Sequence, residues 1–403
     1  MKLLSKFFLA TLLLTVASVS WAACPEGQKQ TYKGCEIDLD VLDQTDITQL
    51  GPAPRNDPVP NGVMYRGVTK EQWDTIAKIG DPLNCRERVR QFQQITEGTF
   101  LTEKDCANDL YCIQDALRDS DVVILGGGTY KIGDVLRVYS KTLMGRDGER
   151  VTIDASGANT AVKLDKGTLA NVNIQHSKDV GVEFGSSALA YRVVVGNTGV
   201  NDPATHGGHG FKQDGEIVYA GGHLVDKGYT ENCLVSVEAY NGYNESGLSA
   251  VQAQGGNADG YSMKHGTNNV TFIDTHAHHN SDDGFDFWKG GGISPSPTIR
   301  IFYSSSNYNG KHPSRNNGDG NGFKFGSKNK YQAPRKDKGT RLIYGSAACN
   351  NKAHGFDRNG TPRKIIAVGC NSLGNGKNNF QEVSCASVKD PHALKCSMFT
   401  ERP

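Results

Sequence analysis

A glycine followed by a large aromatic residue recurs in the second half of the chain, and this repeat restricts the fold more than any other feature. The copies are Gly260-Tyr261, Gly284-Phe285, Gly322-Phe323 and Gly355-Phe356, with Asn379-Phe380 as a degenerate copy, at steps of 24, 38, 33 and 24 residues. A second element, a short strand ending in asparagine, alternates with the first: 237-VEAYN-241, 276-HAHHN-280, 303-YSSSN-307, 346-SAACN-350 and 367-AVGCN-371. Two elements that alternate in this way are typical of a solenoid, in which each copy forms one coil.

The repeat predicts an all-β fold, a right-handed parallel β-helix. A coil of two or three short strands cannot bury its inner face alone, so neighbouring coils must stack in register. We expect the asparagines to line one corner and to bond from coil to coil, because an amide both donates and accepts. The alternative is that asparagine only favours turns. A content of 48 glycines against 14 prolines also indicates a turn-rich β protein.

The segment before the repeats has a different pattern, and it predicts a helical, disulfide-stapled cap over residues 23–120. Thr69 to Gln72 form a capping box that opens a helix to about Ile79. Apolar residues recur at helical spacing in 84–96 and in 103–118, behind a possible cap at Thr102. From Asp121 on, short strands alternate with turns, so we place the β-helix at 121–385 and a C-terminal tail at 386–403.

The first 22 residues predict a secretory signal peptide and therefore an extracellular or periplasmic protein. Lys2 and Lys6 flank a short apolar run, and Ser20-Trp21-Ala22 resembles a cleavage site. Acylation of Cys24 is the alternative. No other segment has the ~20 apolar residues of a membrane span, so we expect no membrane association.

Ten cysteines, an even number in an exported chain, predict disulfides. We expect bridges within the N-terminal group and between Cys385 and Cys396. Cys349 and Cys370 each precede a predicted ladder asparagine and should stack, either as a disulfide or as two buried thiols.

The net charge is +1, and removal of the two lysines of the signal peptide changes it to −1. A chain so close to neutrality is a poor partner for nucleic acid. We expect a monomer whose functional charge is local.

Acidic residues gather where two copies of the repeat meet. Asp259 precedes Gly260-Tyr261 as Asp283 precedes Gly284-Phe285, so the two should lie on adjacent coils about 4.8 Å apart. Asp282 lies at the same turn, and Asp286 should point outward from the following strand. Four such carboxylates repel one another unless a cation lies between them, and an all-oxygen ligand set favours Ca²⁺. A calcium that only stiffens the turn is the simpler alternative.

The next coil replaces an acid with a base. It reads Gly322-Phe323-Lys324 where the preceding coil reads Gly284-Phe285-Asp286, so Lys324 should stand beside Asp286. A nearby calcium ion would lower the pKa of this lysine and make it a competent general base, whereas an ion pair with Asp286 would raise the pKa. Calcium beside a lysine suits β-elimination on a uronate polymer, in which the lysine removes the C5 proton.

The motifs that carry these residues resemble polysaccharide lyase family 9, the pectate lyases. The segments are 257-NADGYSMKHG-266, 280-NSDDGFDFW-288, 320-GNGFKFG-326 and 355-GFDRN-359. The resemblance covers roughly residues 230–380 and implies a calcium site at Asp259, Asp282, Asp283 and Asp286. It also implies that Lys324 is the base and that the substrate is pectate, an acidic polysaccharide. Residues 23–100 have no counterpart in that family's pattern.

Two other functions remain open. Polygalacturonases, which are hydrolases, are also β-helices, and 257-NAD-259 with 282-DD-283 resembles their motifs loosely. Their G-H-G motif should follow these pairs, yet Gly208-His209-Gly210 precedes them. The third possibility is a non-catalytic β-helix that binds polysaccharide, as adhesins and phage tail proteins do.

The remaining polar signals are weaker. We expect Lys264 and Arg358 to bind substrate carboxylates beside the groove, although solvated surface charge is an equal alternative. The loop from Asn317 begins like an EF-hand, but Lys328 stands where glutamate should close it. His276, His278 and His279 lack the helical spacing of zinc ligands and are expected at the surface.

Overall fold

The computed structural model describes most of the chain from residue 67 onward. The described residues are 28–31, 34–37, 67–81, 83–107, 109–199, 208–214, 216–220, 223–227, 230–243, 256–264, 268–287, 298–311, 318–326, 340–361 and 364–399. The predicted signal peptide and Cys24 lie outside these residues. Among the helices that are described, none has the length and apolar character needed to cross a membrane.

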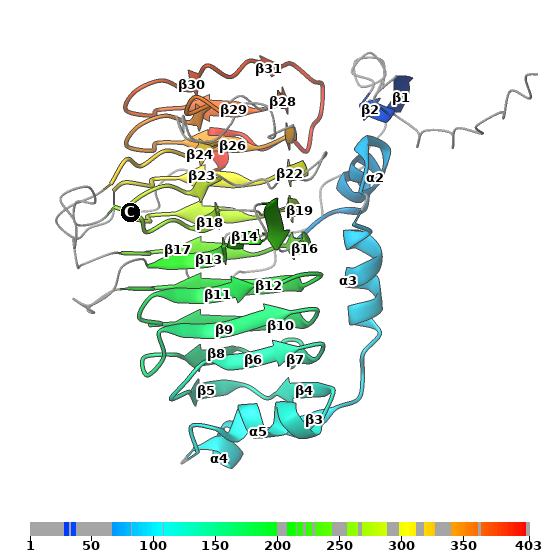
Figure 1. Cartoon of the computed structure of the whole chain (residues 1–403), viewed down its shortest axis with the longest axis vertical. Helices are drawn as coiled ribbons and strands as arrows, with labels where there is room; N and C mark the ends of the chain where they lie inside the picture. The colour runs from blue at the N-terminus through cyan, green and yellow to red at the C-terminus, as the bar shows by residue number, and fades with distance from the viewer. Residues whose placement is uncertain are drawn as a thin grey trace, which may run out of the picture.

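Three parallel ladders of short strands run along the molecule and form a parallel β-helix (Figure 1). Ladder one contains β3 (Thr99–Leu101), β4 (Val122–Leu125), β7 (Thr142–Gly145), β10 (Thr168–Gln175), β12 (Leu189–Gly196), β16 (Thr230–Val235), β19 (Asn268–Ile273), β22 (Thr298–Phe302), β25 (Thr340–Tyr344), β28 (Lys364–Val368) and β31 (Cys385–Ala386). Its first strand, β3, precedes Asp121, where the sequence pattern placed the start of the β-helix.

Ladder two continues each coil. It contains β5 (Gly128–Lys131), β8 (Val151–Asp154), the second halves of β10 and β12, β17 (Glu238–Tyr240), β20 (His276–His278), β23 (Ser305–Asn307), β26 (Ala347–Cys349) and β29 (Asn371–Leu373). Ladder three contains β6 (Leu136–Tyr139), β9 (Thr160–Asp165), β11 (Val180–Phe184), β13 (His209–Asp214), β18 (Tyr261–Lys264), β21 (Phe285–Asp286), β24 (Phe323–Lys324), β27 (Phe356–Asp357) and β30 (Phe380–Gln381). Two antiparallel hairpins, β1 (Gln28–Thr31) with β2 (Gly34–Ile37) and β14 (Glu216–Ala220) with β15 (His223–Lys227), lie outside the ladders.

The aromatic residues of the repeat stack on one another inside ladder three. Tyr261, Phe285, Phe323, Phe356 and Phe380 are paired in register from coil to coil. Successive ring centroids lie 4.5, 4.5, 4.9 and 5.3 Å apart. Such stacks add specific aromatic contacts to the burial of apolar area. The predicted repeat and its coil steps are therefore confirmed.

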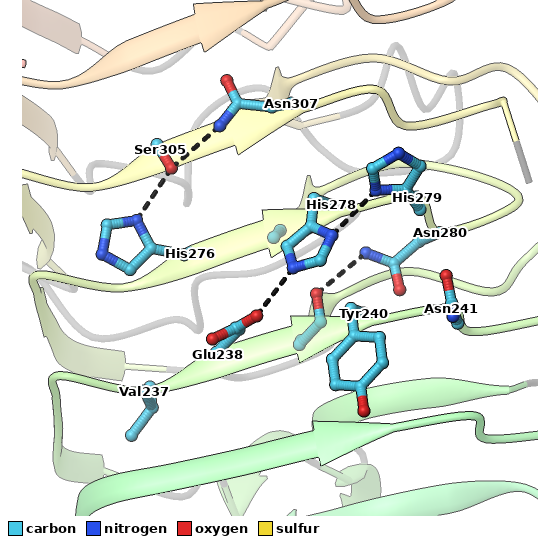
Figure 2. Close-up of polar contacts among 12 residues, drawn as sticks. Val237, Glu238, Tyr240, Asn241, His276, His278, His279, Asn280, Ser305 and Asn307 are labelled. Atoms are coloured by element: carbon cyan, nitrogen blue, oxygen red, sulfur yellow. Dashed lines mark hydrogen bonds and ion pairs between the residues drawn. The ribbon is translucent and has the colours of Figure 1, made fainter. Parts of the chain in front are cut away.

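A ladder of asparagines also forms, but most of its members differ from the prediction. Amides connect Asn280 to Asn309 at 3.0 Å, Asn309 to Asn351 at 3.1 Å and Asn351 to Asn375 at 3.0 Å. Asn280 also donates to the Ala239 carbonyl on the preceding coil (Figure 2). Of the predicted members, which were Asn241, Asn280, Asn307, Asn350 and Asn371, only Asn280 belongs to this ladder. Asn241 does form a coil-to-coil amide bond, but with Asn197, at 3.3 Å.

The error has a physical cause in the turn that precedes the ladder position. The residue before each ladder asparagine has a left-handed backbone, with φ of 55° at His279 and 58° at Asn350. Asparagine tolerates this conformation better than most residues. At Asn241 and Asn350 the sequence pattern therefore selected the turn position in place of the ladder position that follows it. Asn307 and Asn371 lie instead in the strands β23 and β29.

The two repeat elements meet in space. A Cβ added to Gly284 would lie 1.9 Å from Ser306 Oγ and 2.7 Å from Asn309 Nδ2. Glycine precedes the stacked aromatic residue because the polar ladder of the neighbouring coil occupies the space of a side chain.

The N-terminal helices do more than cap one end. α2 (Lys70–Ile79) begins with the predicted capping box at Thr69. The short α4 (Glu103–Cys106) begins at the predicted cap Thr102, which also forms a capping box. The predicted helix over 103–118 is divided into α4 and α5 (Cys112–Asp119), and the disulfide between Cys106 and Cys112 joins them. α4 and α5 lie at the first coils, whereas α2 and α3 (Cys85–Gln93) run along the side of the β-helix (Figure 1).

α3 seals part of the outer face of ladder one. Val89 and Phe92 are buried there, and Phe92 packs against Tyr191 with ring centroids 5.6 Å apart. The Cys85–Cys233 disulfide joins α3 to β16 across 148 residues of sequence.

The remaining cysteines pair differently from the prediction. The bridge within the N-terminal group, Cys106–Cys112, is confirmed, but Cys396 bonds to Cys349 and not to Cys385. The C-terminal segment, which includes a 3₁₀ turn η1 (Cys396–Met398), folds back over ladder two and brings Cys396 onto β26. Cys370 does not stack on Cys349. It lies beside Cys385, whose Sγ accepts its N–H at 2.9 Å.

Asn309→Ala should lower the free energy of unfolding by about 3 kcal/mol, because two buried amides lose a partner. Denaturant unfolding followed by circular dichroism measures this loss. Asn350→Gly is the control: it keeps the left-handed turn accessible and should cost less than about 1 kcal/mol. Equal losses in the two variants would contradict the assignment of Asn309, in place of Asn350, to the ladder.

Candidate active site

Polar side chains form a row along the edge where the chain enters ladder three. In this acceptor row, each side chain accepts a hydrogen bond from the backbone N–H of the equivalent residue on the next coil. The bonds run from Asp259 N to His209 Nδ1 (3.3 Å), Asp283 N to Asp259 Oδ1 (3.3 Å), Asn321 N to Asp283 Oδ1 (2.7 Å), His354 N to Asn321 Oδ1 (3.2 Å) and Asn378 N to His354 Nδ1 (3.2 Å). The row therefore requires an acceptor at each coil, and Asp, Asn and His all provide one.

A second row, here called the outer row, lies three residues further along each coil. Register pairs place its members in one line on ladder three: Lys212, Ser262, Asp286, Lys324, Asp357 and Gln381. The residues on either side of the three central members are core residues: Tyr261 and Met263 beside Ser262, Phe285 and Phe287 beside Asp286, and Phe323 and Phe325 beside Lys324. The outer row therefore faces away from the core.

Three carboxylates of these two rows converge. One oxygen each from Asp259, Asp283 and Asp286 lies within 4.8 Å of the others, and all three side chains are buried. Two oxygens on opposite sides of one calcium ion are at most about 5 Å apart, because Ca–O distances are about 2.3–2.6 Å. The spacing and the all-oxygen donor set therefore fit a calcium ion.

Asp282, the fourth predicted ligand, does not belong to this cluster of three. Its two oxygens accept the backbone N–H groups of Asn257 and Asp319, each at 2.6 Å, and hold two loops together. The carboxylate of Asp282 still lies close enough to help raise the pKa of Asp283, so it adds negative charge at the edge of the cluster.

Lys324 lies against the cluster, as predicted, but its ion pair differs from the predicted one. It is in register with Asp286, yet its Nζ bonds to Asp283 Oδ2 at 2.8 Å. A weaker contact of 3.4 Å leads to the exposed Asp319. The lysine side chain is only 13% exposed.

The pKa shifts indicate an excess of negative charge. Burial raises the pKa of Asp283 well above its ordinary value, although Lys324 opposes this effect. Burial lowers the pKa of Lys324, but the carboxylates of Asp283, Asp286 and Asp282 outweigh burial and hold the pKa well above its ordinary value. Both shifts favour the protonated form of the group, and a bound cation would oppose them by adding positive charge beside the carboxylates.

The two predicted substrate-binding residues lie on the neighbouring coils of ladder three. Lys264 ends β18, with its backbone in register with Asp214, and its side chain lies outside the described residues. Arg358 follows Asp357 and donates from Nε to the Thr361 carbonyl at 3.0 Å.

His209 was not recognised as part of the site from the sequence, although a signal was present. His209-Gly210-Phe211 matches Asp259-Gly260-Tyr261 and is an earlier copy of the same repeat. Phe211 is in register with Tyr261, and His209 is buried next to Asp259.

The three clustered histidines were predicted to lie at the surface, and this prediction is wrong. His276 is buried and bonds to Ser305, whereas His278 bonds to Glu238 and His279 (Figure 2). His276 also bonds to Asp274. These contacts lie on ladder two, away from the acceptor row.

Comparisons with known proteins agree with this architecture. A family model described as "Pel9A-like, right handed beta helix region" matches residues 96–390. Pectate lyase L of Paenibacillus polymyxa (strain SC2) is 35% identical over 131 residues, which cover 31% of this chain and 27% of that relative. Pectate lyase L of Dickeya dadantii (strain 3937) is 25% identical over 286 residues, which cover 65% of this chain and 59% of that relative. The chain thus spans between about a quarter and three-fifths of the length of these relatives.

The crystal structure of pectate lyase Pel9A matches with a TM-score of 0.53 at 19% identity, covering 75% of each chain. At this identity the likeness concerns the fold. It agrees with the right-handed parallel β-helix, and the match to the family model confirms the resemblance of the motifs to polysaccharide lyase family 9. Because that family model covers residues 96–390, the chain belongs to the Pel9A-like right-handed β-helix family.

Proposed function

We propose that the chain is a calcium-dependent pectate lyase that cleaves polygalacturonate by β-elimination, with Lys324 as the general base. The observation that carries the proposal is the contact between Lys324 Nζ and Asp283 Oδ2 at 2.8 Å, at the edge of three converging carboxylates. The names of the relatives support the same reaction class. The disulfides and the predicted signal peptide support secretion.

In this proposal Asp259, Asp283 and Asp286 hold the cation, and Asp282 adds charge beside them. Calcium, when bound, would attract the substrate carboxylate and make the adjacent C5 proton more acidic. Lys324, which lies on the outer row next to Asp286, would then have its amine beside this proton. We assign Lys264 and Arg358, on the neighbouring coils, to the carboxylates of adjacent sugars.

Lys324 performs the proton transfer. Its neutral amine takes the C5 proton at Nζ, and the electron pair of that bond forms the C4=C5 double bond. The bond between C4 and the glycosidic oxygen breaks, and the oxygen leaves with its electron pair and takes a proton from water. Without a bound cation, Asp283 Oδ2 pairs with the lysine and favours its protonated form. Positive charge gained by the cluster weakens that effect and increases the fraction of neutral amine.

The proposal predicts that polygalacturonate yields an unsaturated product whose absorbance increases with time. Because only the neutral amine acts as base and the pKa of Lys324 is raised, the rate should increase with pH into the alkaline range. A chelator should abolish the reaction, and calcium should restore it. New reducing ends without the absorbance would indicate a hydrolase, and tight binding without cleavage would indicate a binding protein.

Lys324→Ala should reduce the rate of elimination at least about 100-fold, which is the lower range for loss of a general base. Calcium binding measured by calorimetry should persist. Lys324→Arg is the matched variant: it keeps the positive charge beside Asp283 but cannot deprotonate, so it should be equally inactive. If Lys324→Ala keeps a tenth of the rate, the base is another residue, and Lys264 is the next candidate.

Asp283→Asn should weaken calcium binding by more than about tenfold and reduce activity in parallel. The variant keeps an Oδ1 that can accept the Asn321 N–H, so the acceptor row should remain intact. Asp319→Asn is the control, because it removes an exposed carboxylate near Lys324 that lies outside the cluster. Equal calcium affinities for Asp283→Asn and the unmodified protein would exclude Asp283 as a ligand.

A further inference from the structure

Four residues, two from the acceptor row and two from the outer row on two adjacent coils, form the corners of a four-cornered cell around the carboxylate cluster. Asp259 and Ser262 stand three residues apart on one coil, and Asp283 and Asp286 stand three residues apart on the next. Ser262 is in register with Asp286, and adjacent coils are about 4.8 Å apart. Three corners of this cell carry the carboxylates that converge. Ser262 is the fourth corner.

Ser262 has an unusual environment for a hydroxyl group. The residue is 0% exposed, and its Oγ makes no hydrogen bond to any part of the chain that the structure describes. A buried hydroxyl without a partner is costly, and buried polar side chains are generally satisfied. An occupant of the cell would give this oxygen a partner.

The backbone directs the Ser262 side chain toward the cell. Its neighbours Tyr261 and Met263 are fully buried in the core between the ladders. Because side chains alternate along a strand, Ser262 lies on the opposite face, in line with Asp286 and Lys324. The hydroxyl is therefore on the same face as the carboxylate of Asp286, one coil away.

We propose that Ser262 completes the cation site and provides a neutral oxygen ligand from the fourth corner of the cell. This inference rests on the proposed calcium site and adds a residue to it. Calcium takes 6–8 oxygen ligands, and three carboxylates leave room for a hydroxyl. The carboxylates of the cluster already carry more negative charge than Lys324 compensates. A neutral ligand at this corner adds an oxygen without adding further negative charge.

Isothermal titration calorimetry of the full chain with calcium chloride, without substrate, tests this assignment. Ser262→Ala should bind calcium about tenfold more weakly than the unmodified protein. Ser262→Asp should bind it more tightly, because calcium affinity increases with the number of charged ligands. Thr271→Val is the matched control, since Thr271 is also fully buried with an Oγ1 that bonds to no described group, but lies on ladder one.

The outcomes distinguish the role of Ser262 from the existence of the calcium site. Weaker binding by Ser262→Ala with unchanged binding by Thr271→Val would support the assignment. If Ser262→Ala binds calcium as well as the unmodified protein, or if Ser262→Asp binds no more tightly, Ser262 does not contact the cation while the carboxylate site stands. If the unmodified protein does not bind calcium, both the site and the role of Ser262 are wrong.

Discussion

The hydrogen bond from a backbone N–H on one coil to a side-chain acceptor on the preceding coil is the interaction on which the site depends. Asp259 and Asp283 each use Oδ1 for this bond. The same bond that stacks the coils thus fixes these two carboxylates one coil apart, at the cluster. Like charges at this spacing are unfavourable. The hydrogen bonds between the coils hold these carboxylates together against their repulsion, and Lys324 compensates only part of their negative charge.

The other two ladders of the β-helix are partly covered by other segments of the chain. α3 and the Cys85–Cys233 disulfide cover the outer face of ladder one, and the C-terminal segment is fastened to ladder two through Cys349–Cys396. Ladder three keeps a line of polar and charged residues on its outer face. α3 and the C-terminal segment thus cover two sides of the solenoid, and the proposed site lies on the third, where Asp286 and Lys324 are neighbours.

The sequence was sufficient to predict the β-helix, the coil steps and the proximity of Lys324 to the acids, because a stacked solenoid converts equal repeat positions into neighbouring positions. It was insufficient where two physical preferences coincide. Asparagine suits both a left-handed turn and an amide ladder, so Asn350 was predicted in place of Asn351. Disulfide pairing across distant coils, as in Cys349–Cys396, depends on how the C-terminal segment folds back, which no local pattern reveals.

A crystal structure with bound calcium would test the central claim most directly. The account predicts an ion at about 2.3–2.6 Å from oxygens of Asp259, Asp283 and Asp286, with the Lys324 amine released from Asp283 and facing solvent. An ion bound elsewhere, or a Lys324 that stays paired to Asp283 with calcium present, would contradict it.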